Sequence, residues 1–321
     1  GPRMGLPQMI SSRAQFGVLG ATLPLVLVIC MYLGFASTGA ALSGSAINHL
    51  LGIPTAAGSA PIVGILIFGA LTVIVSIFGY QLIHVLGRIA TAAGILGFTY
   101  LFIQLFANYD VGATLGTGAT DPATFMVCLT LGASWQMTYA PYVADYSRYL
   151  PADTSVATTF WSTFLGSVTG TQISMTLGIL IGAVSGGALL EGPVGFVGHL
   201  AGPAYAAFAI YLVIIVGKLT ANTVNAYGGI MSTVTVITSF NAETRISRRA
   251  RSIYIIVFVA LTMVIAIAAS ADFLNNFKNF VLLLLAVFIP WSIINLVDYY
   301  LISKERIDIP ALYDRRGRYG A

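Results

Sequence analysis

Three polar side chains interrupt a long apolar stretch, and their types and spacing could form a binding surface inside a membrane. Lys218, Asn222 and Asn225 lie within the apolar run 203–238. Because they are four and three residues apart, they share one face of an α-helix. Ionisable groups at membrane depth are costly, so this face is expected to line a protein interior or a water-filled path. The alternative is that the amides only join neighbouring helices by hydrogen bonds.

A second such group lies in the run 123–144, where Trp135 and Gln136 follow Gly132. A glycine there could interrupt the helix, and interrupted helices in transporters expose backbone groups to substrate and ions. Trp135 could instead be a core residue whose indole N–H is satisfied. At the end of this run, Asp145 and Arg148 are three residues apart and could pair at the membrane surface.

The composition indicates the elements that must hold these groups. Of 321 residues, 57% are hydrophobic and only 8% are charged, against about 25% charged in soluble proteins. Apolar runs of about 20 residues recur, each long enough to cross a bilayer. We therefore predict an all-α polytopic membrane protein with one transmembrane domain, residues 1–321. Its expected spans, about eight, are 15–47, 61–81, 85–107, 123–144, 159–185, 204–237, 252–271 and 279–301.

The basic residues predict the orientation of these spans. Thirteen of the fifteen Lys and Arg residues fall on alternate loops, and the opposite loops hold only Lys278. Because cytoplasmic loops are enriched in Lys and Arg, the N-terminal edge is expected in the cytoplasm, in a multi-pass protein of the plasma membrane. The outer loops 108–122 and 186–203 read as ordinary connectors.

The sequence lacks the motifs that several other functions require. The chain contains no H-E-x-x-H, G-x-S-x-G or Walker motif, so we predict no catalytic residues and no enzyme. Cys30 and Cys128 fall in apolar runs, so neither a disulfide nor a metal site is predicted. A passive channel would require polar stripes on several spans, and a membrane scaffold or sensor would be expected to carry a soluble domain.

Five motifs in order resemble the nucleobase:cation symporter-1 family, in its purine–cytosine permease branch. The motifs are GPRMGLPQM at 1–9 with SRAQFG at 12–17, ADYSRYLP at 144–151, ANTVNAY at 221–227, DYYLI at 298–302 and ALYDRRGRYG at 311–320. The resemblance implies the five-plus-five inverted repeat of the amino-acid transporter type, normally with twelve helices. The eight spans would be helices three to ten, so the chain is predicted to be a fragment that lacks the first two and last two helices and would not transport alone.

The resemblance also implies particular site residues. Those implied to contact substrate are Phe35, Thr38, Trp135, Gln136, Asn222, Thr223 and Asn225. The implied cation site lies near Gly217, Thr220 and Ala221. Lys218 could replace sodium and carry a proton, because burial disfavours a charged ammonium. It could equally be satisfied by helix carbonyls or by the nearby asparagines.

These residue types suit a flat, neutral heterocycle. Aromatic rings stack on nucleobases with about 1–3 kcal/mol per base, and Asn or Gln amides match base edges with paired hydrogen bonds. The resulting expectation is a monomeric secondary transporter that imports cytosine or a purine by proton or sodium symport, through alternating access. Allantoin, a hydantoin or a vitamin-like heterocycle is the alternative substrate. No cofactor beyond the coupling ion and no nucleic-acid partner are expected.

Overall fold

The structure is a computed structural model that describes residues 2–56, 58–78, 80–116, 121–240 and 247–320, without the side chains of 78–84 and 271. Over these ranges the regular structure is entirely helical. The longer helices are α3 (Thr22–Leu51), α4 (Ile62–Phe78), α5 (Tyr80–Asn108), α7 (Pro122–Met137), α9 (Val156–Val184), α12 (Ala204–Phe240), α13 (Arg248–Ala269) and α14 (Phe273–Val297). Among the described residues, six of these helices are long and apolar enough to cross a membrane, while α4 and α7 are shorter.

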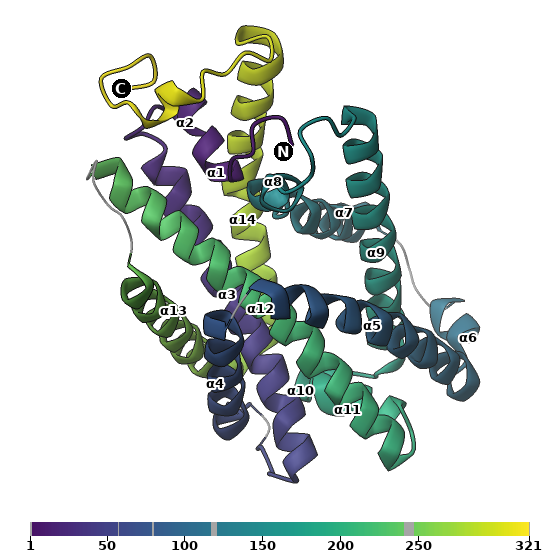
Figure 1. Ribbon diagram of the computed structural model, residues 1–321. Helices are drawn as coiled ribbons and strands as arrows, with labels where there is room; N and C mark the ends of the chain where they lie inside the picture. Colours follow the sequence, from purple (N-terminus) through teal and green to yellow (C-terminus); the bar gives the residue numbers. More distant parts are fainter. Residues whose placement is uncertain (1, 57, 79, 117–120, 241–246, 321) are drawn as a thin grey trace.

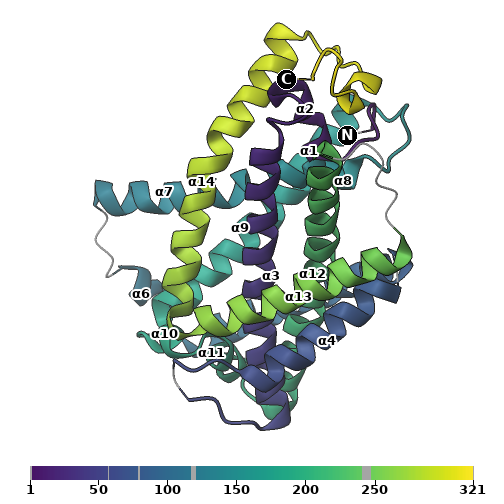
Figure 2. The ribbon, with the colours of Figure 1, turned by 90° about the vertical axis from the view of Figure 1, so that its left-hand side faces the viewer.

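The two longest helices, α3 and α12, lie against each other at the centre of the molecule (Figures 1 and 2). Helix α4 packs on α13. Helix α3 contacts α13 and α14, and in the corresponding way α12 contacts α4 and α5. Exchanging α3, α4 and α5 for α12, α13 and α14 therefore maps these contacts onto one another. Such an exchange is expected of an internal two-fold repeat.

The first helix begins later and ends later than the predicted span 15–47. Residues Arg13–Phe16 form the separate short helix α2, and Gly17 then adopts a φ of 78° that a helix cannot continue. At the other end, α3 includes Asn48 and His49 and stops at Gly52, whose φ of 65° is left-handed. Its N–H bonds to the carbonyl of His49, so the backbone conformation of a glycine, not the first polar residue, ends this helix.

The fourth predicted span, 123–144, is interrupted, although not at Gly132. Asp121 caps α7 by accepting from the N–H groups of Ala123 and Thr124, and the helix continues through Gly132 to Met137. A 3₁₀ turn containing Pro141 follows, and then the short helix α8 (Val143–Ser147). At 1.5 Å per residue α7 is about 24 Å long, shorter than the ~30 Å hydrocarbon core. The proline, which has no N–H to donate, lies within the interruption.

The outer loops are more structured than ordinary connectors. The segment 108–122 contains α6 (Val111–Gly116), and 186–203 contains α10 (Ala188–Glu191) and α11 (Pro193–Leu200). Helix α11 packs on α12 and α3. Gly198 faces the Tyr211 ring so closely that no Cβ fits there. The prediction of simple connectors was therefore wrong, because helices of four to eight residues are too short to be recognised from apolar runs.

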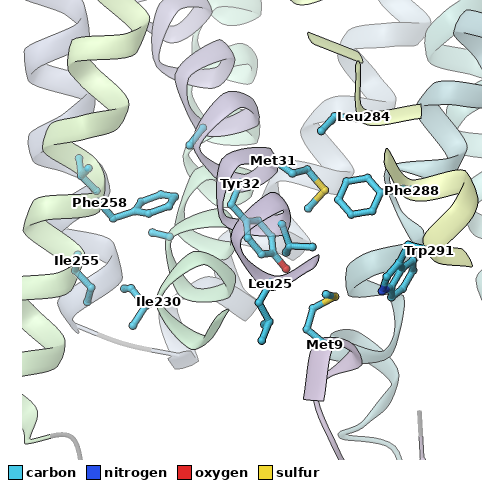
Figure 3. Close-up of a cluster of buried hydrophobic side chains, with 14 of the residues drawn as sticks. Met9, Leu25, Met31, Tyr32, Ile230, Ile255, Phe258, Leu284, Phe288 and Trp291 are labelled. Carbon is cyan, nitrogen blue, oxygen red and sulfur yellow. The ribbon is translucent and has the colours of Figure 1, made fainter. Parts of the chain in front are cut away.

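An apolar cluster joins α3 to α12, α13 and α14. Met31 points toward Phe288, and Trp291 lies beside them (Figure 3). The Trp291 indole Nε1 donates to Ser12 Oγ at 3.2 Å, so this buried ring also satisfies its polar atom. The cluster holds α14 against α3 and thereby determines which side chains of these helices can meet.

The segment that precedes α3 connects several elements at one end of the molecule, where both termini lie (Figure 1). Gln8 of α1 (Gln8–Ser11) donates its backbone N–H to Asp145 at 2.9 Å, and Gln15 donates to Asp298 at 2.7 Å. Asp298 is thus an anchor for the N-terminal segment. Asp145 accepts its hydrogen bonds from Gln8 and Tyr32 of other elements, whereas Arg148 donates to Tyr149 and Tyr227.

Candidate functional site

Two of the predicted substrate residues meet in a group of aromatic rings. The ring of Phe35 on α3 lies 5.9 Å from that of Trp135 on α7, edge to face. Phe277 and Phe280 of α14 complete the group, with centroids 6.5 and 5.4 Å from Phe35. The structure therefore brings rings from three helices together. We refer to these four residues as the ring group.

Glycine and serine residues position the ring group. Gly34 lies directly under the Phe280 ring, so that any Cβ would displace it. Ser134 donates its hydroxyl to the Val281 carbonyl, which fastens α7 to α14 immediately before Trp135. Thr38 lines a cavity of about 130 Å³ beside Phe277 and Phe280, and its hydroxyl bonds to the Gly34 carbonyl of its own helix.

Trp135 and Gln136 face different neighbours. Trp135 is 38% exposed and reaches Phe35, while the Gln136 Oε1 accepts hydrogen bonds from Ser167 and Thr171 of α9 at 3.2 and 3.4 Å. Adjacent residues on a helix are about 100° apart, so both cannot face the same partner. Of the two, only Trp135 lies with the ring group.

Asn222 joins the two central helices. Its Nδ2 donates to the Ala36 carbonyl at 2.8 Å, one residue after Phe35. Gly39 gives the amide the space it needs, because a Cβ there would overlap Oδ1. That Oδ1 is buried and has no hydrogen-bond partner among the described residues. A cavity of about 10 Å³ adjoins it, between α3, α4, α12 and α13, near the lower limit for one water molecule. The contact matches the helix-joining interpretation of this amide and also leaves one polar atom unused.

The other predicted residues of α12 either bond within their own helix or are at least partly exposed. Thr223 is buried and Thr220 half-buried, and both donate to carbonyls one turn earlier, Leu219 and Val216. Asn225 and Gly217 are half-buried and Ala221 is exposed. Lys218 is half-buried too, and within the part of the chain that the structure describes no carboxylate lies within ion-pair distance of it. The structure thus brings Phe35 and Trp135 together, with Thr38 beside Phe277 and Phe280 and Asn222 bonded to the same stretch of α3.

Sequence reasoning missed a larger site, a cavity of about 750 Å³ between α3, α5, α8 and α12. We call it the tyrosine cavity. Its lining includes Asp145, Arg88, Thr220 and the rings of Tyr32, Tyr142, Tyr146, Tyr149 and Tyr227. The sequence predicted a surface segment for the ADYSRYLP motif. Only the fold places its tyrosines opposite α5 and α12.

The carboxyl group of Asp145 is held in this cavity by two donors. Oδ1 accepts the Gln8 N–H at 2.9 Å, and Oδ2 lies 3.5 Å from the Tyr32 hydroxyl. Burial raises the pKa of Asp145, and the Gln8 hydrogen bond and the charge of Arg148 only partly oppose this. The carboxyl is therefore a proton-binding group close to the cytoplasmic end predicted from the basic residues.

A cavity of about 970 Å³ lies at the opposite end of α3, under α10 and α11. His49 lines it and stacks on Tyr211 of α12, with ring centroids 5.2 Å apart. No group of three or more His, Cys, Asp or Glu residues able to hold a metal ion occurs among the described residues.

Long apolar helices around a central α3–α12 pair, with aromatic and amide groups between them, define an all-α multi-pass membrane protein of the transporter class. The whole chain, residues 1–321, matches the family of permeases for cytosine/purines, uracil, thiamine and allantoin, and it belongs to that family. The resemblance to purine–cytosine permeases is thereby confirmed, and the family is one of transporters.

Relatives and a solved structure support this assignment. The "Putative purine-cytosine permease YxlA" of Bacillus subtilis is 35% identical over all of this chain and 68% of its own length. The purine-cytosine permease fcyB of Emericella nidulans is 24% identical over 94% of this chain and 59% of its own length. A structure titled as the inward-facing conformation of Mhp1 superposes with a TM-score of 0.69 at 18% identity, covering 98% of this chain and 68% of that one. It confirms the predicted all-α transporter fold.

Proposed function

We propose that the protein is a secondary active transporter that imports cytosine or a purine across the plasma membrane by symport with a proton or sodium ion. One observation carries the choice of substrate class: Phe35 on α3 and Trp135 on α7 form an edge-to-face ring pair, which Phe277 and Phe280 of α14 extend. Rings stack on flat heterocycles, so this arrangement suits an uncharged base. Membership of the permease family supports the proposal.

Uptake into proteoliposomes that carry the full-length protein tests the transport mode. With an inward proton or sodium gradient, labelled cytosine or adenine should accumulate above its equilibrium level, and an ionophore should abolish the accumulation. A passive channel would instead equilibrate the solute at a rate indifferent to the gradient. Unlabelled cytosine, adenine, hypoxanthine, uracil and allantoin as competitors would identify the substrate, and competition by allantoin alone would favour the alternative class of substrate.

Variants of the ring group test whether these rings bind the substrate. Because stacking on one ring contributes about 1–3 kcal/mol, Phe35→Ala or Trp135→Ala should raise the KM for uptake about tenfold. Trp161→Ala is the control, since Trp161 is an exposed ring on α9 that packs with Phe160 and Phe164 instead. Equal effects of Trp161→Ala and Trp135→Ala would contradict a specific role for the ring group.

Lys218 is proposed as the proton carrier because no carboxylate of the described chain neutralises it and it lies on the polar face of α12. Lys218→Met should remove the pH dependence of uptake while leaving equilibrium binding of the base in place. If Lys218→Met retained the wild-type pH dependence, the proton would have to travel by another group.

A further inference from the structure

The tyrosine cavity is separate from the ring group. None of Phe35, Trp135, Phe277 or Phe280 lines it, and of the residues predicted to bind substrate or cation only Thr220 does. Its walls come from α3, α5, α8 and α12, together with the 3₁₀ turn before α8 and Tyr149 after it. At about 750 Å³ it lies within the range of small-molecule sites, about 300–1,000 Å³.

The tyrosine rings of this cavity support one another. Tyr142 lies 5.9 Å from Tyr32 and 6.1 Å from Tyr146, at interplanar angles of 45° and 61°. Arg148 donates to the hydroxyls of Tyr149 and Tyr227 and so links α8 to α12 behind the cavity wall. Rings placed in this way offer flat faces with hydroxyl groups at their edges, which favours planar ligands with polar edges.

The cavity carries one acidic and one basic side chain. Asp145 contributes a carboxyl whose Oδ2 has only a long contact, 3.5 Å from the Tyr32 hydroxyl, and it can accept a further N–H. Arg88 on α5 contributes a cation to the same lining. An uncharged ligand with both N–H and carbonyl groups can bond to both, with its N–H to Asp145 and its carbonyl to Arg88.

We propose that the tyrosine cavity is a second binding site for a planar, uncharged heterocycle, distinct from the ring group, with Asp145 accepting a ring N–H. The ligand class rests on the proposed function, and the site itself rests on the cavity and its lining. Asp145 of its lining accepts the Gln8 N–H of the N-terminal segment, so the cavity lies toward the end predicted to face the cytoplasm, and it would hold the ligand between the ring group and release.

Equilibrium binding of labelled cytosine and adenine to the purified protein tests the proposal by stoichiometry. Wild-type protein should bind two molecules per chain. Tyr146→Leu, which removes an exposed ring from the lining, should reduce this to one, while Tyr146→Phe should retain two. Phe35→Ala should remove the other molecule. Tyr205→Leu is the control, because Tyr205 is a 78% exposed ring that does not line the cavity.

A second variant tests the cavity independently, in case Tyr146→Leu does not fold. Ala92 is an exposed residue of α5 on the opposite wall, so Ala92→Phe fills the cavity without removing a contact of the ring group. It should also reduce binding to one molecule.

The possible stoichiometries separate the two proposals. One molecule that only Phe35→Ala removes would overturn the second site. One molecule that only Tyr146→Leu and Ala92→Phe remove would support the tyrosine cavity and overturn the ring group. No binding of any base would overturn the proposed function and this inference together.

Discussion

The carboxyl groups of Asp145, within α8, and Asp121, which caps α7, lie in opposite environments. Asp145 is enclosed by the tyrosine cavity, and burial raises its pKa above the ordinary value of 3.8. Asp121 is exposed at the N-terminus of α7, and the hydroxyl and N–H of Thr124 lower its pKa. The two residues therefore contribute to stability with opposite dependence on pH.

The first prediction concerns Asp145→Asn. A folded state that binds a proton more tightly than the unfolded state loses stability as the pH rises from 3.8 through the raised pKa. The asparagine variant does not titrate and can still accept the Gln8 N–H. Its melting temperature relative to wild type should therefore rise as the pH is increased from about 4 to 7, in thermal unfolding of the protein in detergent.

Asp121→Asn serves as the control with the opposite sign. The depressed pKa of Asp121 stabilises the folded state at pH values above 3.8, and this contribution is lost as the pH falls through the lowered value. The melting temperature of Asp121→Asn relative to wild type should thus fall with rising pH. A parallel response of the two variants would show that Asp145 is not buried as described.

At the scale of the elements, α3 and α12 approach closely because each presents a glycine to a side chain of the other. Gly39 on α3 receives the Asn222 amide, and Gly228 on α12 receives the Tyr32 ring. Both contacts are too close to admit a Cβ. Small residues permit such approaches between membrane helices, and Asn222 adds a hydrogen bond across the contact.

We expect Gly39→Ala to destabilise the protein by about 1–3 kcal/mol, because the added methyl group displaces the Asn222 amide. The loss should be smaller when Asn222 is already alanine, so the double variant Gly39→Ala/Asn222→Ala should be more stable than additivity requires. Chemical denaturation of the four proteins of this cycle measures the coupling. Gly94→Ala on α5 is the control, since no atom of another described element lies within 4 Å of its added Cβ. Strict additivity of Gly39→Ala and Asn222→Ala would refute the contact.

At the scale of the whole molecule, Arg13 joins the N-terminal segment, α12 and the C-terminal segment. The side chain is buried and donates to the carbonyls of Leu312 and Thr235, at 3.3 and 3.0 Å, and to Ser239 Oγ at 2.9 Å. Arg315 donates to the Ser239 carbonyl of the same helix end. Two guanidinium groups therefore satisfy carbonyls near the C-terminus of α12, where a positive charge also interacts favourably with the helix dipole.

Arg13→Met should weaken this end of the molecule by about 1.5–3 kcal/mol, the usual contribution of a hydrogen bond to a charged group. Limited proteolysis should then cut the C-terminal segment sooner, and the melting temperature should fall. Arg3→Met is the control, because the Arg3–Glu305 pair at 3.6 Å is exposed and such pairs contribute about 0–1 kcal/mol. Protease resistance equal to that of wild type would mean that Arg13 does not hold the C-terminal segment.

Much of the architecture could be predicted from the sequence. Apolar runs, the alternation of basic residues and five motifs indicated a multi-pass helical transporter of the purine–cytosine permease branch, and the family match and the fold comparison confirm this. The role of Phe35, Trp135 and Asn222 as a substrate site stays a prediction. Helix ends were less predictable, because Gly17, Pro141 and Gly52 act through backbone conformation and not through hydropathy.

The sequence alone determined which segments lie in lipid and which lie in water, since hydropathy over about 20 residues decides whether a helix is stable in a bilayer. Only the tertiary structure decided which polar groups meet. In the fold, Trp135 contacts Phe35, whereas Gln136 bonds to α9. The Asn222 amide donates to the Ala36 carbonyl, and Asp145 lies among tyrosines of three helices. The reason is physical: spacing along a helix specifies a face, whereas the partner of that face depends on how distant helices pack.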